Sequence, residues 1–146
     1  MNAMKLYYRS RWFYTHHMKL IAKFWLGMMY LIYNCYIPYT AEIGKNCKIA
    51  YKGMSVVVHA RAKIGNNVVI GTCVTIGGNK KEVGVPIIED NCYLATGCKV
   101  FGDISIGEGS FIGANTVVTR SIPPKSLVSG IPAKIIKENI DIHDYY

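Results

Sequence analysis

The stretch AKIGNNVVIGTCVTIGG, residues 62–78, places a large aliphatic residue at every sixth position. The same period continues through IIEDNCYLATGCKVFGDISIGEGSFIGANTVVT, residues 87–119. In both stretches the residue after each aliphatic is mostly small, and Asn, Gly or Asp often stands two positions later. Because repeats of fixed period stack on one another, this pattern predicts a solenoid of short strands rather than a fold with helical crossovers.

Each position of the repeat has a physical reason. An aliphatic side chain every six residues fills the centre of a narrow coil, and the position two residues earlier has less room, so it takes Ala, Ser, Cys or Val. Asn, Gly and Asp tolerate the left-handed backbone that a sharp corner needs. The inward aliphatic series is Ile43, Ile49, Val58, Ile64, Ile70, Ile76, Ile88, Leu94, Val100, Ile106, Ile112 and Val118.

Residues 1–40 follow a different pattern, in which apolar residues recur at helical spacing until Pro38 ends it. This segment contains five Lys and Arg residues and no acid. It predicts a helical, basic and aromatic region whose wide apolar face must be buried. The candidates for its cover are the rest of the chain, another subunit or a membrane surface, and anionic lipid or a polyphosphate ligand suits its charge.

The cysteine pattern indicates the compartment. The five cysteines are an odd number and form no CxxC pair, so neither a disulfide framework nor a zinc site is predicted. Free thiols favour a reducing compartment, and we expect a cytoplasmic protein, with the inner face of the membrane as a second location. Lys23 and Asn34 interrupt the apolar run 20–37, which argues against a membrane span.

Three segments carry a resemblance to a known family: the two quoted above and IPPKSLVSGIPAKII, residues 122–136. Together they resemble the hexapeptide-repeat acyltransferases, in the serine acetyltransferase-like branch that includes polysaccharide O-acetyltransferases. The resemblance covers residues 41–136 and leaves 137–146 as a tail. It implies a mainly β, left-handed parallel β-helix with three strands per coil. It also implies acetyl-CoA as co-substrate and a homotrimer with active sites between subunits.

Two breaks in the six-residue period point to a site. Three extra residues lie between Ile49 and Val58, and six more lie within Gly77–Pro86. With three hexapeptides per coil, Val58 lies against Ile76 and His59 lies beside Gly77, so the extruded loop leaves the corner that carries His59. An imidazole is a good general base near neutral pH, and we predict that role for His59.

Other residues complete the predicted site. Glu82, in the loop, is the nearest candidate to orient His59, and Tyr51 could line the acceptor pocket opposite a neighbouring subunit's His59. Cys73, at another corner, is a less favoured nucleophile. The resemblance places coenzyme A along the later coils and the C-terminal segment. The matching positions here are Ala95, Gly113, Ala114, Arg120, Lys125 and Lys134.

The acceptor is either L-serine or a sugar of a surface polysaccharide precursor. Serine acetyltransferases carry an Asp-His pair where this chain reads Ala50, Tyr51 and Lys52, which strengthens the sugar alternative. A non-catalytic trimeric scaffold that docks on a membrane or partner is the other hypothesis. A metal enzyme of the γ-carbonic anhydrase type needs several histidines on neighbouring coils, and the repeats contain only His59. No nucleic-acid-binding motif is present.

Overall fold

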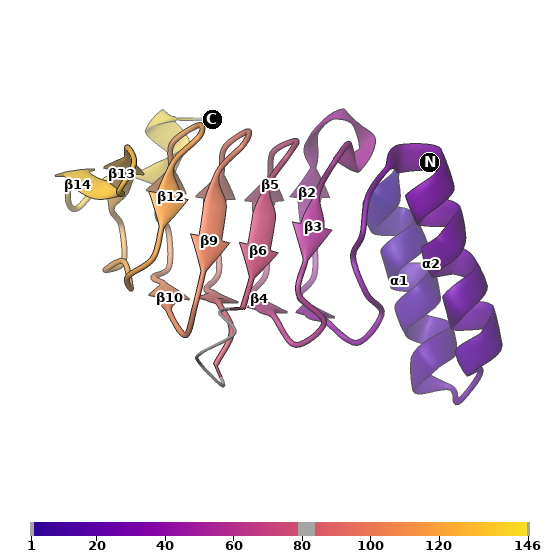
Figure 1. Ribbon diagram of the computed structural model, residues 1–146. Coiled ribbons are helices and arrows are strands. Elements are labelled where there is room, and N and C mark those ends of the chain that lie inside the picture. Colours follow the sequence, from indigo (N-terminus) through magenta and orange to yellow (C-terminus); the bar gives the residue numbers. More distant parts are fainter. Residues whose placement is uncertain (1, 79–83, 146) are drawn as a thin grey trace.

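The computed structural model describes residues 2–78 and 84–145. Two helices, α1 (Ala3–Thr15) and α2 (Lys19–Tyr33), form a hairpin at one end of a stack of short strands (Figure 1). Helix α2 ends before Pro38, because Asn34 takes the left-handed conformation (φ 48°) that closes a helix. Within the described residues, no helix is long and apolar enough to cross a bilayer.

The strands are two to four residues long and follow the six-residue period. Their bounds are β1 Glu42–Ile43, β2 Lys48–Ile49, β3 Val57–Val58, β4 Lys63–Ile64, β5 Val69–Ile70, β6 Thr75–Gly77, β7 Ile87–Ile88, β8 Tyr93–Leu94, β9 Lys99–Phe101, β10 Ser105–Ile106, β11 Phe111–Ile112, β12 Val117–Val118, β13 Leu127–Ser129 and β14 Lys134–Lys137. Two 3-10 turns, η1 (Ala50–Gly53) and η2 (Ile142–Asp144), complete the elements.

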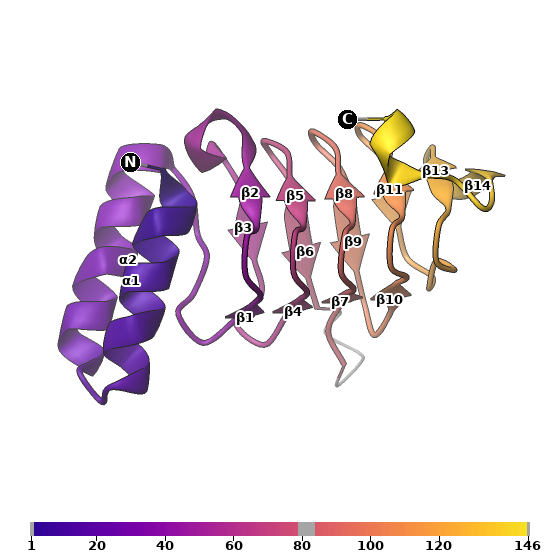
Figure 2. The ribbon, with the colours of Figure 1, turned by 180° about the vertical axis from the view of Figure 1, so that it is seen from behind.

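From β1 to β12, every third strand returns to the same sheet. The three sheets run β1-β4-β7-β10, β2-β5-β8-β11-β13-β14 and β3-β6-β9-β12, parallel throughout except for the β13–β14 pair. Residues one coil apart pair directly, as Val58 does with Ile76 and Ile76 with Val100. The predicted solenoid of three strands per coil is therefore confirmed (Figure 2).

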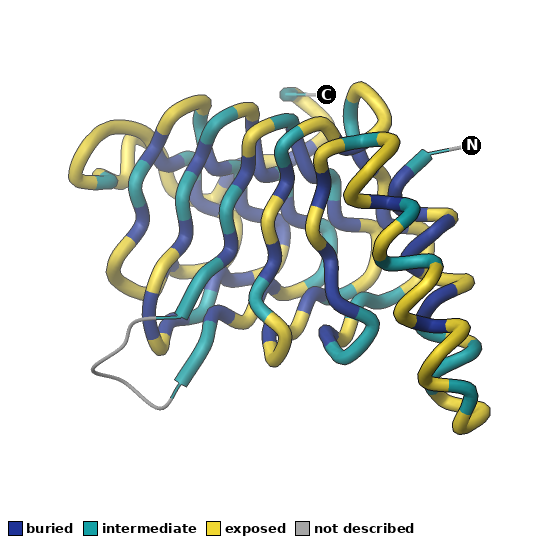
Figure 3. Tube along the Cα trace, turned by 45° about the vertical axis from the view of Figure 1, so that its right-hand side comes forward, coloured by how far each residue is buried: buried dark blue, intermediate teal, exposed yellow. Residues whose placement is uncertain are grey.

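The inward aliphatic series forms the core. Eleven of its twelve members are buried, and Ile43, in the first coil, is partly buried and packs against the same cluster. Cys47, Cys92 and Cys98 occupy the smaller inward positions and are buried as predicted. Buried residues consequently alternate with intermediate or exposed ones along strands β2 to β13 (Figure 3).

The three corners of the coil differ in backbone conformation. We name them by the strand before them: the first follows β1, β4, β7 and β10, the second follows β2, β5, β8 and β11, and the third follows β3, β6, β9 and β12. Left-handed residues such as Asn67 and Asn115 form the first and second corners. At the third corner, Gly102 (φ 102°) has the positive φ, not Asp103 as the repeat suggested.

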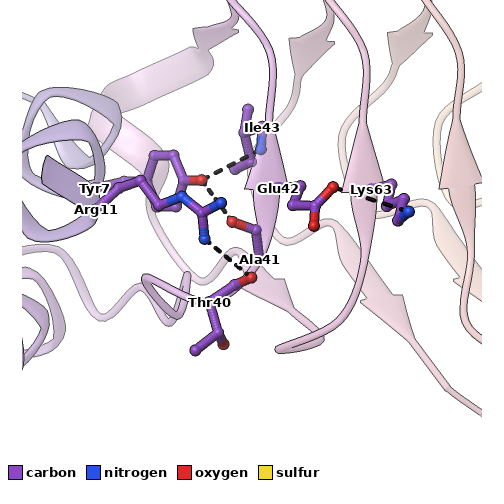
Figure 4. Close-up of polar contacts among 7 residues, drawn as sticks. All are labelled: Tyr7, Arg11, Thr40, Ala41, Glu42, Ile43 and Lys63. Atoms are coloured by element: carbon purple, nitrogen blue, oxygen red, sulfur yellow. Dashed lines mark hydrogen bonds and ion pairs between the residues drawn. The ribbon is translucent and has the colours of Figure 1, made fainter. Parts of the chain in front are cut away.

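Helix α1 is tied to the first coil by polar contacts (Figure 4). The Tyr7 hydroxyl donates to the Ala41 carbonyl (2.7 Å) and accepts from the Ile43 N–H (3.2 Å). Burial raises the pKa of Tyr7 to about 12, so the phenol stays protonated. Arg11 Nη1 donates to the Tyr39 carbonyl at 2.9 Å, so two α1 side chains hold the segment that enters β1.

Much of the apolar face predicted for residues 1–40 is not covered by this chain. Ala22 and Met29 are fully buried on the inner side of α2. The outward residues Leu20, Phe24 and Leu31 are 83%, 60% and 79% exposed. The hairpin therefore uses one side of α2 for the fold and leaves the opposite side open.

The C-terminal segment folds back onto the solenoid. The Ile140 N–H donates to the Lys125 carbonyl (3.0 Å), and Ile140 and Ile142 are buried. The Tyr145 ring lies 5.5 Å from that of Phe111, which itself stacks on Tyr93. Residues 138–145 thus pack along the second sheet.

We expect Tyr7→Phe to lower the free energy of unfolding by about 1–3 kcal/mol, because the Ala41 carbonyl and the Ile43 N–H lose their buried partner. Chemical denaturation of the two proteins measures the difference. Glu42→Gln is the control, since its ion pair with Lys63 spans 3.9 Å between side chains about 60% exposed. That variant should stay within about 0.5 kcal/mol of the wild type, and equal effects of the two substitutions would contradict the assignment.

Thr116→Val should raise the free energy of unfolding by about 1 kcal/mol. Thr116 is fully buried two residues before Val118, and its Oγ1 has no hydrogen-bond partner among the described residues. Folding therefore removes the hydroxyl from water and gives it no hydrogen bond in exchange. Ser110→Ala is the matched control, because Ser110 Oγ donates to the Pro123 carbonyl and accepts from the Ser126 N–H. Thermal unfolding should shift in opposite directions for the two variants.

Candidate active site

The third corner carries the candidate catalytic residue. Three features place His59: its N–H donates to the Ile76 carbonyl (2.8 Å), Val58 pairs with Ile76, and its ring is partly buried. A Cβ added to Gly78 would lie 3.5 Å from His59 Cδ2 and Nε2, so the imidazole lies beside the start of the extruded loop. The predicted neighbourhood of His59 and Gly77 is thus present in the structure.

The hydrogen bond of the ring defines its tautomer. The Arg61 backbone N–H donates to His59 Nδ1 (3.1 Å), and a backbone N–H cannot accept. Neutral His59 in this arrangement therefore carries its proton on Nε2, the nitrogen beside Gly78. In this state Nε2 donates a hydrogen bond, and it can accept a proton only after the ring changes tautomer and gives up the Arg61 contact.

Phe101 forms a wall of this corner that the sequence reasoning did not single out. A Cβ added to Gly77 would lie 2.7 Å from Phe101 Cε1, so the ring rests directly on the Gly77 backbone. Phe101 follows the inward Val100 and breaks the small-residue rule at the same repeat position as His59. The signal that identified His59 was therefore available for Phe101.

Asp103 lies where the loop rejoins the coil. A Cβ on Gly84 would come within 2.3 Å of all three Asp103 carboxyl atoms, so the carboxyl group packs against the Gly84 backbone. Glu82, the predicted partner of His59, belongs to residues 79–83 and lies outside the described residues. Among the described carboxylates at the third corner, Asp103 lies nearest to Gly84. The sequence reasoning did not single it out.

Tyr51 lies at the second corner, away from His59 within one chain. It belongs to η1, with φ 44°, and its side chain is 80% exposed. Together with Lys52, Leu31 and Met54 it lines a pocket of about 600 Å³ between η1 and the end of α2. Any contact of Tyr51 with a His59 would therefore involve another subunit.

The predicted coenzyme A residues are distributed over all three corners. Arg120, at the third corner, and Lys134, in β14, line one pocket of about 300 Å³ with Thr119 and Pro132. Lys125, after Ile122, stacks on the first corner that follows β10, where its N–H donates to the Glu108 carbonyl (2.8 Å), and it lines a separate pocket of about 690 Å³ with the C-terminal segment. Ala95, Gly113 and Ala114 lie at the second corner.

Of these residues, Arg120 shares an edge with His59, and Lys134 joins it only through the pocket that the two residues line. The strands that precede His59 and Arg120 are β3 and β12, three steps apart in the order β3-β6-β9-β12. With neighbouring strands ~4.8 Å apart, the two residues are separated by about 14 Å along one edge. A partly buried imidazole and a pocket with two cations thus lie at opposite ends of a straight edge, with Phe101 between them.

Four of the five thiols are unsuited to nucleophilic chemistry. Burial raises the pKa of Cys35 and Cys98 to about 12 and that of Cys92 to about 11, and it also raises the pKa of Cys47. Cys73 is exposed at the second corner. Within residues 2–78 and 84–145, no three His, Cys, Asp or Glu side chains gather as a metal site requires.

The fold and this edge define a class: a β-helix of hexapeptide repeats with a histidine at one of its corners. The family described as bacterial transferase hexapeptide (six repeats) matches residues 86–120. Serine acetyltransferases of Bacillus licheniformis and Staphylococcus aureus are each 40% identical over 139 residues, 94% of this chain. The chain spans 61% and 62% of those two relatives, about three fifths of their length.

Solved structures give the same result. The serine acetyltransferase of Brucella abortus in complex with coenzyme A has a TM-score of 0.86 and 30% identity, covering 93% of this chain and 55% of that one. The soybean enzyme complexed with serine has a TM-score of 0.84 and 31% identity, covering 92% and 56%. By sequence and fold the chain resembles hexapeptide-repeat acyltransferases of the serine acetyltransferase-like branch, and its fold matches the left-handed β-helix of those structures.

The burial of the thiols predicts a simple titration. A disulfide reagent such as Ellman's reagent should modify one thiol rapidly in the native protein and five after denaturation, because only Cys73 is exposed. Cys73→Ser should remove the rapid phase, whereas Cys98→Ser should leave it unchanged. Rapid reaction of a second thiol in native protein would contradict the packing of the inward cysteines.

Proposed function

We propose that this protein transfers an acetyl group from acetyl-CoA to the hydroxyl of a small acceptor. One observation carries the proposal. The third corners of successive coils form one edge, and His59 and the Arg120–Lys134 pocket lie at opposite ends of it. Coenzyme A has its thioester at one end of the pantetheine arm and its phosphates at the other. Cations suit the phosphates, and an imidazole suits the proton transfer at the thioester. The coenzyme A complex of the Brucella relative supports this donor.

In the proposed reaction His59 acts as the general base. It takes the proton of the acceptor hydroxyl on Nε2 while the oxygen forms a bond to the thioester carbon. The C–S bond then breaks, the acetyl ester is formed, and the proton passes to the thiolate to give free coenzyme A. In this route the ring must release the Arg61 N–H and carry its proton on Nδ1, because only then does Nε2 have a free electron pair.

The contact with Arg61 favours a second role for the same residue. With Nδ1 accepting from the Arg61 N–H, Nε2–H is a donor aimed at the space beside Gly78. A donor in this position stabilises the negative charge that develops on the thioester oxygen. The two roles use the same nitrogen with opposite proton positions, so they respond differently to substitution.

L-serine is the first acceptor to test, because the relatives are serine acetyltransferases and the soybean structure contains serine. A sugar hydroxyl is the second, because Ala50, Tyr51 and Lys52 replace the Asp-His pair of the serine enzymes. In a homotrimer Tyr51 would face a neighbouring His59 and line the acceptor pocket. The free thiols of all five cysteines support a reducing, cytoplasmic setting.

The decisive experiment follows free coenzyme A released from acetyl-CoA with L-serine and a panel of sugars. We expect His59→Ala to lower kcat/KM by about 10²–10⁴-fold with the accepted substrate. His59→Gln separates the two roles, because the glutamine amide can donate from a position near Nε2 but cannot act as a base. A general base predicts equal loss in both variants, and a donor predicts substantial recovery in the glutamine variant.

Two further variants serve as controls. Cys73→Ser should keep full turnover, and its inactivity would indicate covalent cysteine catalysis instead. Arg120→Ala should raise KM for acetyl-CoA with little change in kcat, whereas Arg61→Ala should leave that KM unchanged. If acetyl-CoA does not bind and no acceptor promotes release, the non-catalytic scaffold replaces the enzyme.

A further inference from the structure

The outward side of helix α2 is an apolar stripe made by Leu20, Phe24 and Leu31. Their spacing of four and seven residues places them on one side of the helix. Gly27 lies between Phe24 and Leu31, and a Cβ added there would meet nothing within 4 Å. The outward side of α2 is therefore open from Leu20 to Leu31 in this chain.

Cations and aromatic rings border the stripe. Lys19 and Lys23 are exposed on one flank, and Lys23 lines a shallow pocket of about 370 Å³ with Leu26, Tyr30 and Tyr36. On α1, Trp12 is 52% exposed. Tyr and Trp side chains prefer the boundary between lipid headgroups and acyl chains, and lysines extend to the anionic headgroups above it.

The charge of the hairpin is of one sign. Residues 2–41 contain five Lys and Arg side chains and no Asp or Glu, and Glu42 is the first acid. Arg11 is held by the Tyr39 carbonyl, and Arg9 lies 5.2 Å from the centre of the Trp25 ring. Lys5, Arg9, Lys19 and Lys23 remain exposed to solvent.

We propose that the stripe of Leu20, Phe24 and Leu31, with Lys19 and Lys23 beside it, docks on a membrane surface that contains anionic lipid. The apolar side chains enter the headgroup boundary and the lysines meet the lipid phosphates. Symmetric pairing of two copies through the stripe would instead bring four ammonium groups together, with no helix carboxylate to offset them. Charge complementarity therefore selects an anionic lipid surface over a second copy.

The hairpin is placed for such contact. It forms one end of the solenoid, and the Arg120–Lys134 pocket lies toward the opposite end, where β12, β13 and β14 are found (Figures 1 and 2). Docking through α2 leaves all three corners of the later coils exposed. Vesicle binding requires no acetyl transfer, so the two proposals stand or fail separately.

Cosedimentation of the full chain with vesicles tests the proposal. We expect binding to phosphatidylcholine vesicles that contain phosphatidylglycerol, little binding to pure phosphatidylcholine, and release by salt. Lys19→Glu/Lys23→Glu should weaken binding at least about 25-fold, since each cation near an anionic surface contributes about fivefold. Leu20→Ser/Phe24→Ser/Leu31→Ser should lower it at least about tenfold, because the inserted apolar area is lost.

Matched variants at other exposed positions control for net charge and hydrophobicity. Lys48→Glu/Lys137→Glu changes the net charge equally, and Ile131→Ser/Ile136→Ser removes side chains 73% and 62% exposed at the far end. Both should bind vesicles within about twofold of wild type, and circular dichroism confirms that every variant is folded. Equal binding to neutral vesicles, or unchanged binding by the stripe variant, overturns the proposal. The proposal is also overturned if the wild type fails to bind vesicles and forms an assembly that dissociates when the stripe is replaced. In that case a second copy of the chain occupies the stripe.

Discussion

The interior of the coil has room for one large aliphatic side chain per strand, and the rest of the structure depends on this constraint. Ile76 stacks between Val58 and Val100, and the same succession repeats on each sheet. Since strands of two or three residues bury little by themselves, stability comes from the stacking of successive coils. A residue that does not fit this succession has to lie at a corner, and chemistry is therefore restricted to corners.

The three corners differ in backbone conformation and in the side chains that they present. At the first and second corners, left-handed residues such as Asn67 and Asn115 turn the chain tightly. The third corner has Gly102 as its positive-φ residue, and it holds His59 and Phe101. A single straight edge there runs from the His59 imidazole to the Arg120–Lys134 pocket, and the proposed function depends on this arrangement.

The helical hairpin is joined to the solenoid on one side only. Tyr7 and Arg11 hold the entry to β1, and Met29 closes the inner side of α2. A helix such as α2 that is apolar on two sides needs a packing partner on each side, and this chain provides a partner on one side only. The outward stripe and the surrounding cations follow from the same segment of sequence, and they give the molecule a second surface separate from the third-corner edge that carries His59.

The amino-acid sequence alone determined the solenoid, the pairing of Val58 with Ile76 and the inward cysteines, because a period of six residues fixes which side chains face the core. It also led to His59, since a break in the repeat is visible without coordinates. Only the tertiary structure decided the tautomer of His59, the wall formed by Phe101 and the separation of Lys125 from Arg120. Those features depend on which corner each residue reaches and on contacts between coils, and a one-dimensional period does not specify either.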